Sequence, residues 1–138
     1  MNKNKIIIVI LSFVVLLTVI YGFMDGGSPQ DARKKRYDDK RIQDIQMIKS
    51  WVNSYYGKNS TLPQSIFDAL TEYNDGRNSK MLTDPETNSE YTYQIVTDIE
   101  YKICAVFSTD TTSITQEYLM DYSHPSGSHC LTFKGDKY

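Results

Sequence analysis

The residues of this chain with the greatest potential for chemistry are two cysteines and two histidines in its C-terminal third. Cys104 lies in the apolar stretch I-C-A-V-F, and Cys130 directly follows His129, with His124 close before it. Two thiolates and two imidazoles form a ligand set that Zn²⁺ accepts. Their spacing matches no compact zinc motif, and adjacent residues of a strand point to opposite faces, so His129 and Cys130 would not easily share a metal. A zinc site is therefore the less favoured interpretation.

A disulfide between Cys104 and Cys130 is the preferred interpretation. Cys104 falls in the middle of one predicted strand and Cys130 at the start of another, and neighbouring strands bring such residues within bonding distance. The bond would stabilise the fold by about 3 kcal/mol. Two free buried thiols remain an alternative. A nucleophilic cysteine assisted by a histidine is disfavoured, because an apolar run does not stabilise a thiolate.

The segment D-P-E-T-N-S-E, which begins at Asp84, gathers carboxylate and amide side chains in one predicted loop. Asp84, Glu86 and Asn88 supply the oxygen ligands that Ca²⁺ prefers, although their spacing is not that of an EF-hand. A solvated turn before a strand is the competing interpretation. The chain carries no glycine-rich phosphate loop, serine-triad motif or H-E-x-x-H motif. We therefore expect no enzymatic activity, and Ca²⁺ is the cofactor for which the sequence offers candidate ligands.

Positive charge is concentrated near the N-terminal side of the chain, although the net charge is −2. Four consecutive cations stand there: Arg33, Lys34, Lys35 and Arg36. They are candidates for contact with anionic lipid headgroups, with a solvated helix end as the alternative. A nucleic-acid partner is disfavoured, because the remaining chain is acidic and no aromatic platform lies near these cations.

An uncharged apolar run from Ile6 to Phe23 follows a short stretch that carries Lys3 and Lys5. As a helix rising ~1.5 Å per residue, this run is about long enough to cross a hydrocarbon core of ~30 Å. It is apolar on every side, unlike the amphipathic helices of soluble proteins. No small-x-small cleavage pair stands at its end, so we expect a retained single-pass anchor in contact with membrane lipid.

The orientation of this anchor depends on two conflicting signals. Counting basic residues near the membrane places the C-terminal side in the cytoplasm. The basic cluster, however, begins about ten residues beyond the apolar run and precedes a whole domain, where that rule weakens. The two cysteines suit an oxidising compartment. We therefore expect the C-terminal domain to be extracytoplasmic.

The sequence divides into a tail and anchor (1–24), a Gly/Ser/Pro hinge (25–30) and one further domain (31–138). Ser28 is a predicted N-cap, with Pro29 in the first helical position and Asp31 in a capping-box arrangement. Because Arg33 to Arg36 lie close to the positive end of the helix dipole, we expect firm helix only from about Asp38.

Periodicity then predicts an α+β fold. One face of a long helix is marked by apolar residues at helical spacing, and Gly57 is its expected C′ residue: Ile42, Ile45, Ile48, Val52 and Tyr55. A second helix is predicted from Pro63 or Gln64 to Tyr73, with Ile66, Phe67 and Leu70 buried. Alternating residues predict strands around 91–96 and 101–107, and a last strand over 130–133. The stretch 108–122 is expected to be a surface loop with a short helical turn. The long helix should lie across a three-stranded antiparallel sheet.

The order of these elements resembles a known family. From Arg41 to Phe107 the chain shows R-x-x-D-I-x-x-I-x-x-W-V-x-x-Y-Y, then G-x-x-x-x-L-P and D-P-x-T-N-x-x-Y-x-Y. This order is similar to that of the G-type major pseudopilin of type II secretion and of related type IV pilin-like proteins. The resemblance implies a pilin-like domain, partners among pilin-like or secretion-system subunits and, in some members, calcium in the loop that matches Asp84 to Asn88.

Two departures from that family bear on function. Residues 1–5 lack the glycine of a pilin leader, and the run 6–23 lacks the family's intramembrane glutamate. We therefore expect a plain tether rather than a filament core. The expected function is that of a membrane-anchored, non-enzymatic pseudopilin-like envelope protein, accessory to a secretion or pilus system. The alternative is a stand-alone ligand-binding or adhesion domain that uses a tyrosine-rich sheet as its contact surface.

Overall fold

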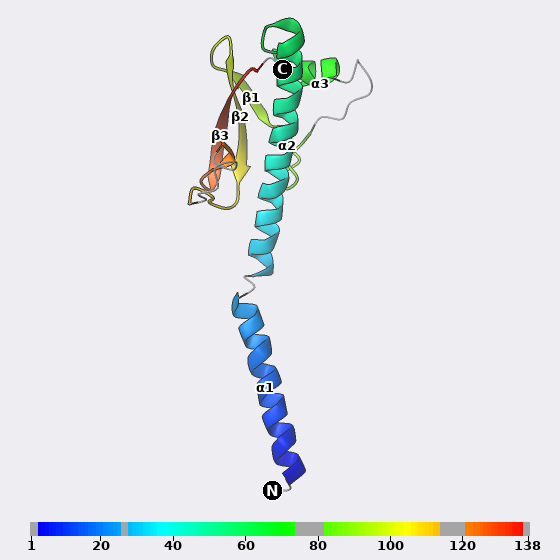
Figure 1. The fold of residues 1–138 in the computed structure, drawn as a ribbon, viewed down its shortest axis with the longest axis vertical. Helices are drawn as coiled ribbons and strands as arrows, with labels where there is room; N and C mark the ends of the chain where they lie inside the picture. The colour runs from blue at the N-terminus through cyan, green and yellow to red at the C-terminus, as the bar shows by residue number, and fades with distance from the viewer. Residues whose placement is uncertain (1–2, 26–27, 74–81, 114–120, 137–138) are drawn as a thin grey trace. The chain divides into compact units, whose positions relative to one another are not determined.

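A computed structural model describes residues 3–25, 28–73, 82–113 and 121–136 of the chain. It divides into two units, Met1–Arg33 and Lys34–Tyr138, and each is described by itself (Figure 1). The predictions for residues 74–81 and for the centre of the loop 108–122 lie outside the described residues.

The first unit contains helix α1, Lys3–Asp25. Within it, Lys3–Gly22 has a mean hydropathy of 2.6 and buries none of its surface. Thr18, one of its few polar residues, donates its hydroxyl to the carbonyl of Val15 at 2.8 Å, so that group is satisfied within the helix. In the described part of the chain, this is the helix long and apolar enough to cross a membrane.

Helix α2 extends from Pro29 to Asn59. The Asp31 N–H donates to Ser28 Oγ at 3.1 Å, and Ser28 Oγ donates to the Asp31 carboxylate at 2.8 Å, which forms the predicted N-cap. The expectation of firm helix only from about Asp38 is wrong, since this cap and the fixed φ of Pro29 offset the repulsion between the helix dipole and the following cations.

The C-terminal end of α2 also differs from the prediction. Gly57 lies within the helix, which continues to Asn59. Ser60 takes the left-handed conformation instead, with φ 57°, and its N–H donates to the carbonyl of Tyr56 at 2.8 Å. A polar residue thus ends the helix without glycine, at a small conformational cost.

Helix α3, Ile66–Tyr73, starts later than predicted because Ser65 is its cap. The Asp68 N–H donates to Ser65 Oγ at 3.1 Å. Ile66, Ala69 and Leu70 are buried, whereas Phe67 is 56% exposed, so its predicted burial is wrong. Positions 66, 69 and 70 share one face, while position 67 is rotated about 100° from position 66.

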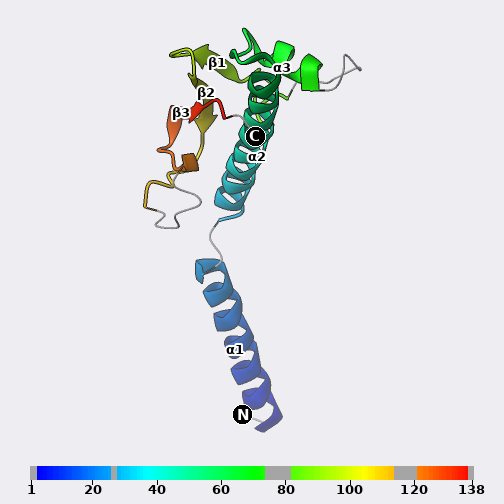
Figure 2. The ribbon, with the colours of Figure 1, turned by 45° about the horizontal axis from the view of Figure 1, so that its top comes forward.

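Three antiparallel strands form the sheet: β1 (Thr92–Ile95), β2 (Glu100–Phe107) and β3 (Gly127–Lys134), in the order β1-β2-β3. Alternate residues of β2 and β3 are buried, as the period of two predicted: Tyr101, Ile103, Ala105, Phe107, Leu131 and Phe133. These side chains pack against the buried face of α2, which includes Ile45, Ile48 and Val52. Helix α2 lies between the sheet and α3, which confirms the α+β class (Figures 1 and 2).

Cys104 and Cys130 are joined by a disulfide across β2 and β3. They are direct partners in the strand register, with Cα atoms 3.9 Å apart. Because they alternate with core residues, they lie on the sheet face that points away from α2. The bond therefore links two strands from outside the apolar core.

Candidate functional site

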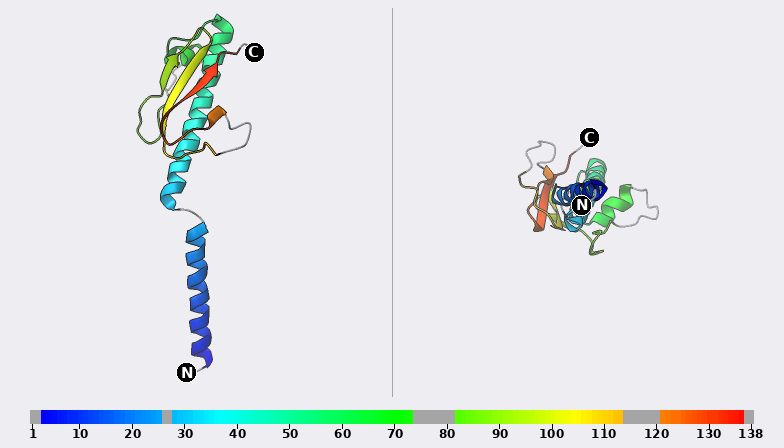
Figure 3. Two further views of the ribbon diagram at one scale, coloured as in Figure 1. Left: turned by 90° about the vertical axis from the view of Figure 1, so that its left-hand side faces the viewer. Right: turned by 90° about the horizontal axis from the view of Figure 1, so that it is seen from below.

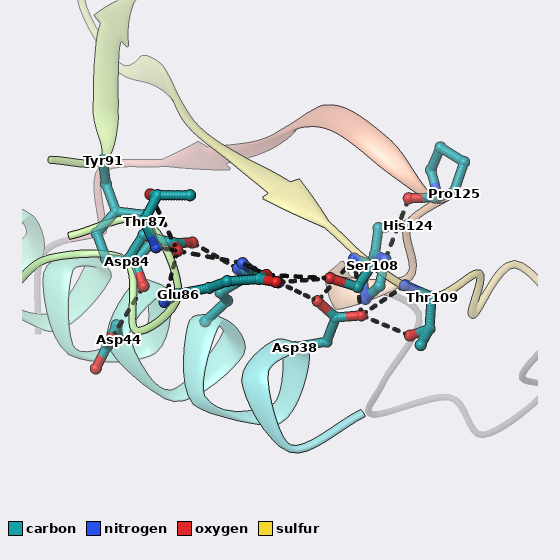
Figure 4. Close-up of polar contacts among 11 residues, drawn as sticks. Asp38, Asp44, Asp84, Glu86, Thr87, Tyr91, Ser108, Thr109, His124 and Pro125 are labelled. Carbon is teal, nitrogen blue, oxygen red and sulfur yellow. Dashed lines mark hydrogen bonds and ion pairs between the residues drawn. The ribbon is translucent and has the colours of Figure 1, made fainter. Parts of the chain in front are cut away.

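A buried arginine stands at the centre of the most highly charged site in the second unit. Arg41, on α2, is 1% exposed. Its Nε donates to Asp84 at 2.5 Å, its Nη1 to Asp38 at 2.7 Å and its Nη2 to Glu86 at 2.8 Å. Nη1 also donates to Ser108 Oγ at 3.1 Å. One guanidinium thus connects α2, the loop before β1 and the residue after β2. Figure 4 labels its partners Asp38, Asp84, Glu86 and Ser108.

Asp38 holds the segment that follows β2 against the helix. Its carboxylate accepts the N–H of Ser108 at 2.9 Å, the N–H of Thr109 at 2.7 Å and the Thr109 hydroxyl at 2.6 Å. These bonds and the Arg41 ion pair satisfy a side chain that is only 3% exposed. The carboxylate of Asp38 is therefore bound by other residues of the same domain (Figure 4).

Asp84 organises its own loop while it binds Arg41. Its Oδ1 accepts the backbone N–H groups of Glu86 at 2.9 Å and Thr87 at 2.8 Å. Its backbone carbonyl accepts the N–H of Asn88 at 2.9 Å, and Asn88 has a left-handed φ of 57°. The loop is thus closed by its first carboxylate, which is a common role for aspartate in turns.

Asp44 extends the same polar surface one turn further along α2. It is 1% exposed, and it accepts Lys40 Nζ at 2.5 Å and the Tyr91 hydroxyl at 3.0 Å. Residues 38, 41, 44 and 45 follow one another at helical spacing. The buried face of α2 is therefore charged before Ile45 and mostly apolar after it, with Asn53 as a buried polar residue near its end.

The charges of this Arg41 cluster stabilise one another. Burial alone would raise the pKa of Asp84, but hydrogen bonds from Arg41 and from two backbone N–H groups lower it to about 2. Burial likewise opposes ionisation of Asp38, yet its bonds to Thr109, Ser108 and Arg41 lower its pKa. Burial would lower the pKa of Arg41, and the bonds to Asp84, Glu86 and Asp38 raise it instead. All three groups are ionised at neutral pH.

The predicted calcium ligands are only partly brought together. Asp84 and Glu86 converge, but both carboxylates are turned toward Arg41. Asn88 contributes its backbone N–H to the loop. Across the described ranges, no group of three or more histidine, cysteine or acidic residues is arranged for a metal. The guanidinium supplies the positive charge that a calcium ion would bring to these carboxylates.

The cysteine and histidine set does not form a site. Both cysteines are consumed by the disulfide, and the described residues include no free cysteine, so the zinc and nucleophile alternatives lose their thiolates. His124 is 2% exposed, and its ring stacks on Phe107 at 3.6 Å. Burial lowers the pKa of His124. His129 lies opposite Ala105 in the strand register. His124 is therefore packed into the fold, whereas His129 is only half-buried in β3.

The four consecutive cations differ from Arg41. Arg33, Lys34, Lys35 and Arg36 are all exposed. Within the described residues, none of them forms an ion pair, whereas Lys40 and Arg41 do. The described residues therefore supply no ion-pair partner for these four charges.

Sequence reasoning missed the centre of the Arg41 cluster, although a signal was present. Asp38, Arg41 and Asp44 are in phase with Ile45 and Ile48 on the helix. A charged residue in phase with an apolar stripe either lies beyond the core or is buried together with a partner of opposite charge. Here these residues are buried with their partners. Counting only apolar residues along the stripe hid this pattern.

Together, the fold and the Arg41 cluster define a small α+β domain stabilised by an internal ion-pair cluster, preceded by a helix able to cross a membrane. Comparison of the chain with protein-family models, with curated proteins and with solved structures found no match.

Proposed function

We propose that this protein is a membrane-tethered, non-enzymatic envelope protein that displays a pilin-like α+β domain in the extracytoplasmic space, as an accessory component of a secretion or pilus system. One observation carries the proposal. Helix α1 is apolar on all sides and buries none of its candidate span, while the second unit has a hydrophobic core of its own. A helix of this composition is stable in a lipid bilayer and costly to expose to water.

The disulfide supports the extracytoplasmic side. Cys104 and Cys130 form it on the outer face of the sheet, where both cysteines are only partly buried. Disulfides persist in oxidising compartments and are rare in the cytosol. The bond thus favours an external domain over the orientation suggested by counting basic residues.

The Arg41 cluster supports a non-enzymatic role. Its buried groups, Arg41, Asp38 and Asp84, bond to one another, and Arg41 also donates to the half-exposed Glu86. Catalytic groups instead keep a face directed at substrate. The cluster holds two loops against α2, and this is a structural task.

One feature supports the pilin-like part of the proposal, and one differs from the calcium-binding members of the family. A long helix, α2, packs along a three-stranded antiparallel sheet (Figure 3). The loop at Asp84, which matches the calcium loop of some family members, is closed here by Arg41. We propose that this loop keeps its shape without a bound calcium ion.

The adhesion alternative is less favoured, because three of the eleven tyrosines on which it was based pack into the core. Tyr91 and Tyr101 are 6% and 0% exposed, and Tyr93 packs against the same core. These tyrosines of the sheet region stabilise the fold and are not displayed to a ligand.

Alkaline carbonate extraction of membranes that contain the full chain tests the tether. We expect the protein to stay in the pellet. The variant Val15→Lys/Leu16→Lys should be extracted, because each lysine at the centre of a span costs about 3 kcal/mol. The matched variant Val15→Ala/Leu16→Ala should remain. Extraction of the unaltered chain would contradict the tether.

Cross-linking in cells that make pilin-like and secretion subunits tests the accessory role. We expect adducts between this chain and those subunits, and they should be lost when Val15→Lys/Leu16→Lys releases the protein from the membrane. Recovery of the chain alone, from cells in which the subunits are assembled, would contradict the accessory role and leave the tether standing.

A further inference from the structure

The exposed cations at the start of α2 form a ring around the helix. Successive residues of an α-helix are about 100° apart, so four consecutive residues cover nearly every direction. Arg33, Lys34, Lys35 and Arg36 therefore point to all sides of α2, and all four are exposed. We call these four residues the basic collar.

The short linker between α1 and α2 keeps the basic collar close to the end of the proposed membrane span. Only residues 26–28 separate the end of α1 at Asp25 from the start of α2 at Pro29. Four Cα–Cα steps of ~3.8 Å place these two residues at most about 15 Å apart. Arg33 follows one helical turn later. The long side chains of arginine and lysine extend the reach of the collar further.

The fold itself gives no reason for these four charges. Within the described residues, the collar forms no ion pair. Asp31 is bound to Ser28, and Asp38 is turned inward to Arg41, Ser108 and Thr109. The collar also lies near the positive end of the α2 dipole, where cations weaken a helix. Stability of the domain alone would favour neutral or acidic residues at these positions.

We propose that the basic collar binds the phosphate groups of anionic lipids at the surface of the membrane that α1 crosses. The inference rests on the tether in the proposed function and adds a second contact with the same membrane. A ring of cations suits a helix that rises from the surface, because some of its charges face the headgroups at any tilt. The anionic surface neutralises the charge for which the described residues supply no ion-pair partner.

Hydrogen exchange of the full chain in lipid nanodiscs tests the collar. One set of discs contains phosphatidylcholine alone, and the other contains an equal mixture with phosphatidylglycerol. At low salt, we expect the backbone amides over 30–37 to exchange at least about fivefold more slowly in the mixed discs, the effect of a single cation near such a surface. At ~1 M NaCl, where the Debye length is ~3 Å, the difference should disappear.

Two variants show whether charge is responsible. Replacement of all four residues by glutamine should abolish the difference between the two kinds of disc. The variant Arg33→Lys/Arg36→Lys keeps the charge and should preserve the difference. Equal exchange of the unaltered chain in both discs would overturn the proposal, and so would a difference that survives in the glutamine variant.

The same experiment separates the lipid from other sources of phosphate and from failure of the tether. Inorganic phosphate added to phosphatidylcholine discs at constant ionic strength should give no protection; full protection there would overturn the assignment to lipid. If α1 does not enter the bilayer, the chain will not co-elute with discs of phosphatidylcholine alone, where the collar has no anionic lipid to bind. That result would contradict the proposed function itself, whereas co-elution without lipid-dependent exchange contradicts the collar alone.

Discussion

Helix α2 carries two groups of charged residues that are close together in sequence. One group is exposed to solvent and the other is buried. The basic collar, Arg33 to Arg36, is exposed and without an ion pair among the described residues. Arg41, five positions later, is buried and bound to three carboxylates. A buried charge is tolerated only when its partners are in place, whereas an exposed one costs little to leave alone. The same residue type is therefore part of the packed fold at position 41 and exposed at positions 33 and 36.

The largest expected effect follows from removal of the buried arginine. Arg41→Met leaves Asp38 and Asp84 buried without their cation, and this should cost about 3 to 5 kcal/mol of unfolding free energy. Arg36→Met, on the same helix, should change it by less than about 0.5 kcal/mol. Urea unfolding of the full chain in neutral detergent measures both variants.

A second variant keeps this comparison informative if Arg41→Met does not fold. Arg41→Lys retains the charge but not the several directed donors of the guanidinium, so its stability should lie between those of Arg41→Met and the unaltered protein. Equal stability of the Arg36 and Arg41 variants would contradict the distinction between the two groups.

Acid should destabilise the Arg41 cluster before it affects the collar. The folded pKa of Asp84 is about 2, below its ordinary value, so the stabilisation is fully present above pH ~4. It is lost as pH falls from ~4 toward 2, and the loss amounts to about 2 kcal/mol. Asp38, whose pKa is also lowered, contributes in the same direction.

Unfolding by urea across this pH range measures the effect. Asp84→Asn should flatten the acid limb, because the group that takes up a proton on unfolding is gone. A control at the exposed Asp39→Asn should leave the limb unchanged. An acid limb that is the same in all three proteins would show that the low pKa of Asp84 does not contribute to stability.

Neutralisation of the collar should change the unfolding free energy by less than removal of Arg41 or acid does. It should raise this free energy rather than lower it. Replacement of all four residues by glutamine removes cations from the positive end of α2 and should raise the unfolding free energy by about 1 kcal/mol in uncharged detergent. The gain should shrink in anionic lipid, where the collar is neutralised from outside. A loss of stability in uncharged detergent would mean that the collar has partners within the protein.

Calcium should have the smallest effect. Because Arg41 already supplies a positive charge to Asp84 and Glu86, the midpoint of thermal unfolding should be the same with excess CaCl₂ and with EGTA. A midpoint raised by calcium in the unaltered protein would contradict the structural role assigned to Arg41. Magnesium chloride at equal ionic strength is the control.

The sequence predicted the elements better than their ends. Alternation along 101–107 marked the buried side of β2, and the spacing of Ile45, Ile48 and Val52 marked the buried side of α2, because burial follows these periods directly. The ends of the helices depend on single capping residues, and several neighbouring residues in the sequence are able to cap a helix. Ser60, not Gly57, follows the last residue of α2. Helix α3 starts at Ile66, after Ser65, and not at Pro63 or Gln64 as predicted.

Only part of the Arg41 cluster could be predicted, because its members are far apart in the sequence. Asp84 and Glu86 were recognised as a group of carboxylates because they are close in sequence. Their cation comes from position 41, and the hydrogen bond from Arg41 to Asp84 joins residues 43 positions apart. Only the packing of the loop against α2 brings these residues together, and periodicity carries no information about such pairings.

The central claim is that a membrane tether holds the domain outside the cytoplasm. The oxidation state of the cysteines in cells tests this claim most directly. Cells that make the full chain are quenched with acid, and the denatured protein is treated with a maleimide–polyethylene glycol reagent before or after reduction. We predict no adduct before reduction and two adducts afterwards, at Cys104 and Cys130, on a protein recovered from carbonate-washed membranes. Two adducts without reduction would place the domain in a reducing compartment and contradict the account.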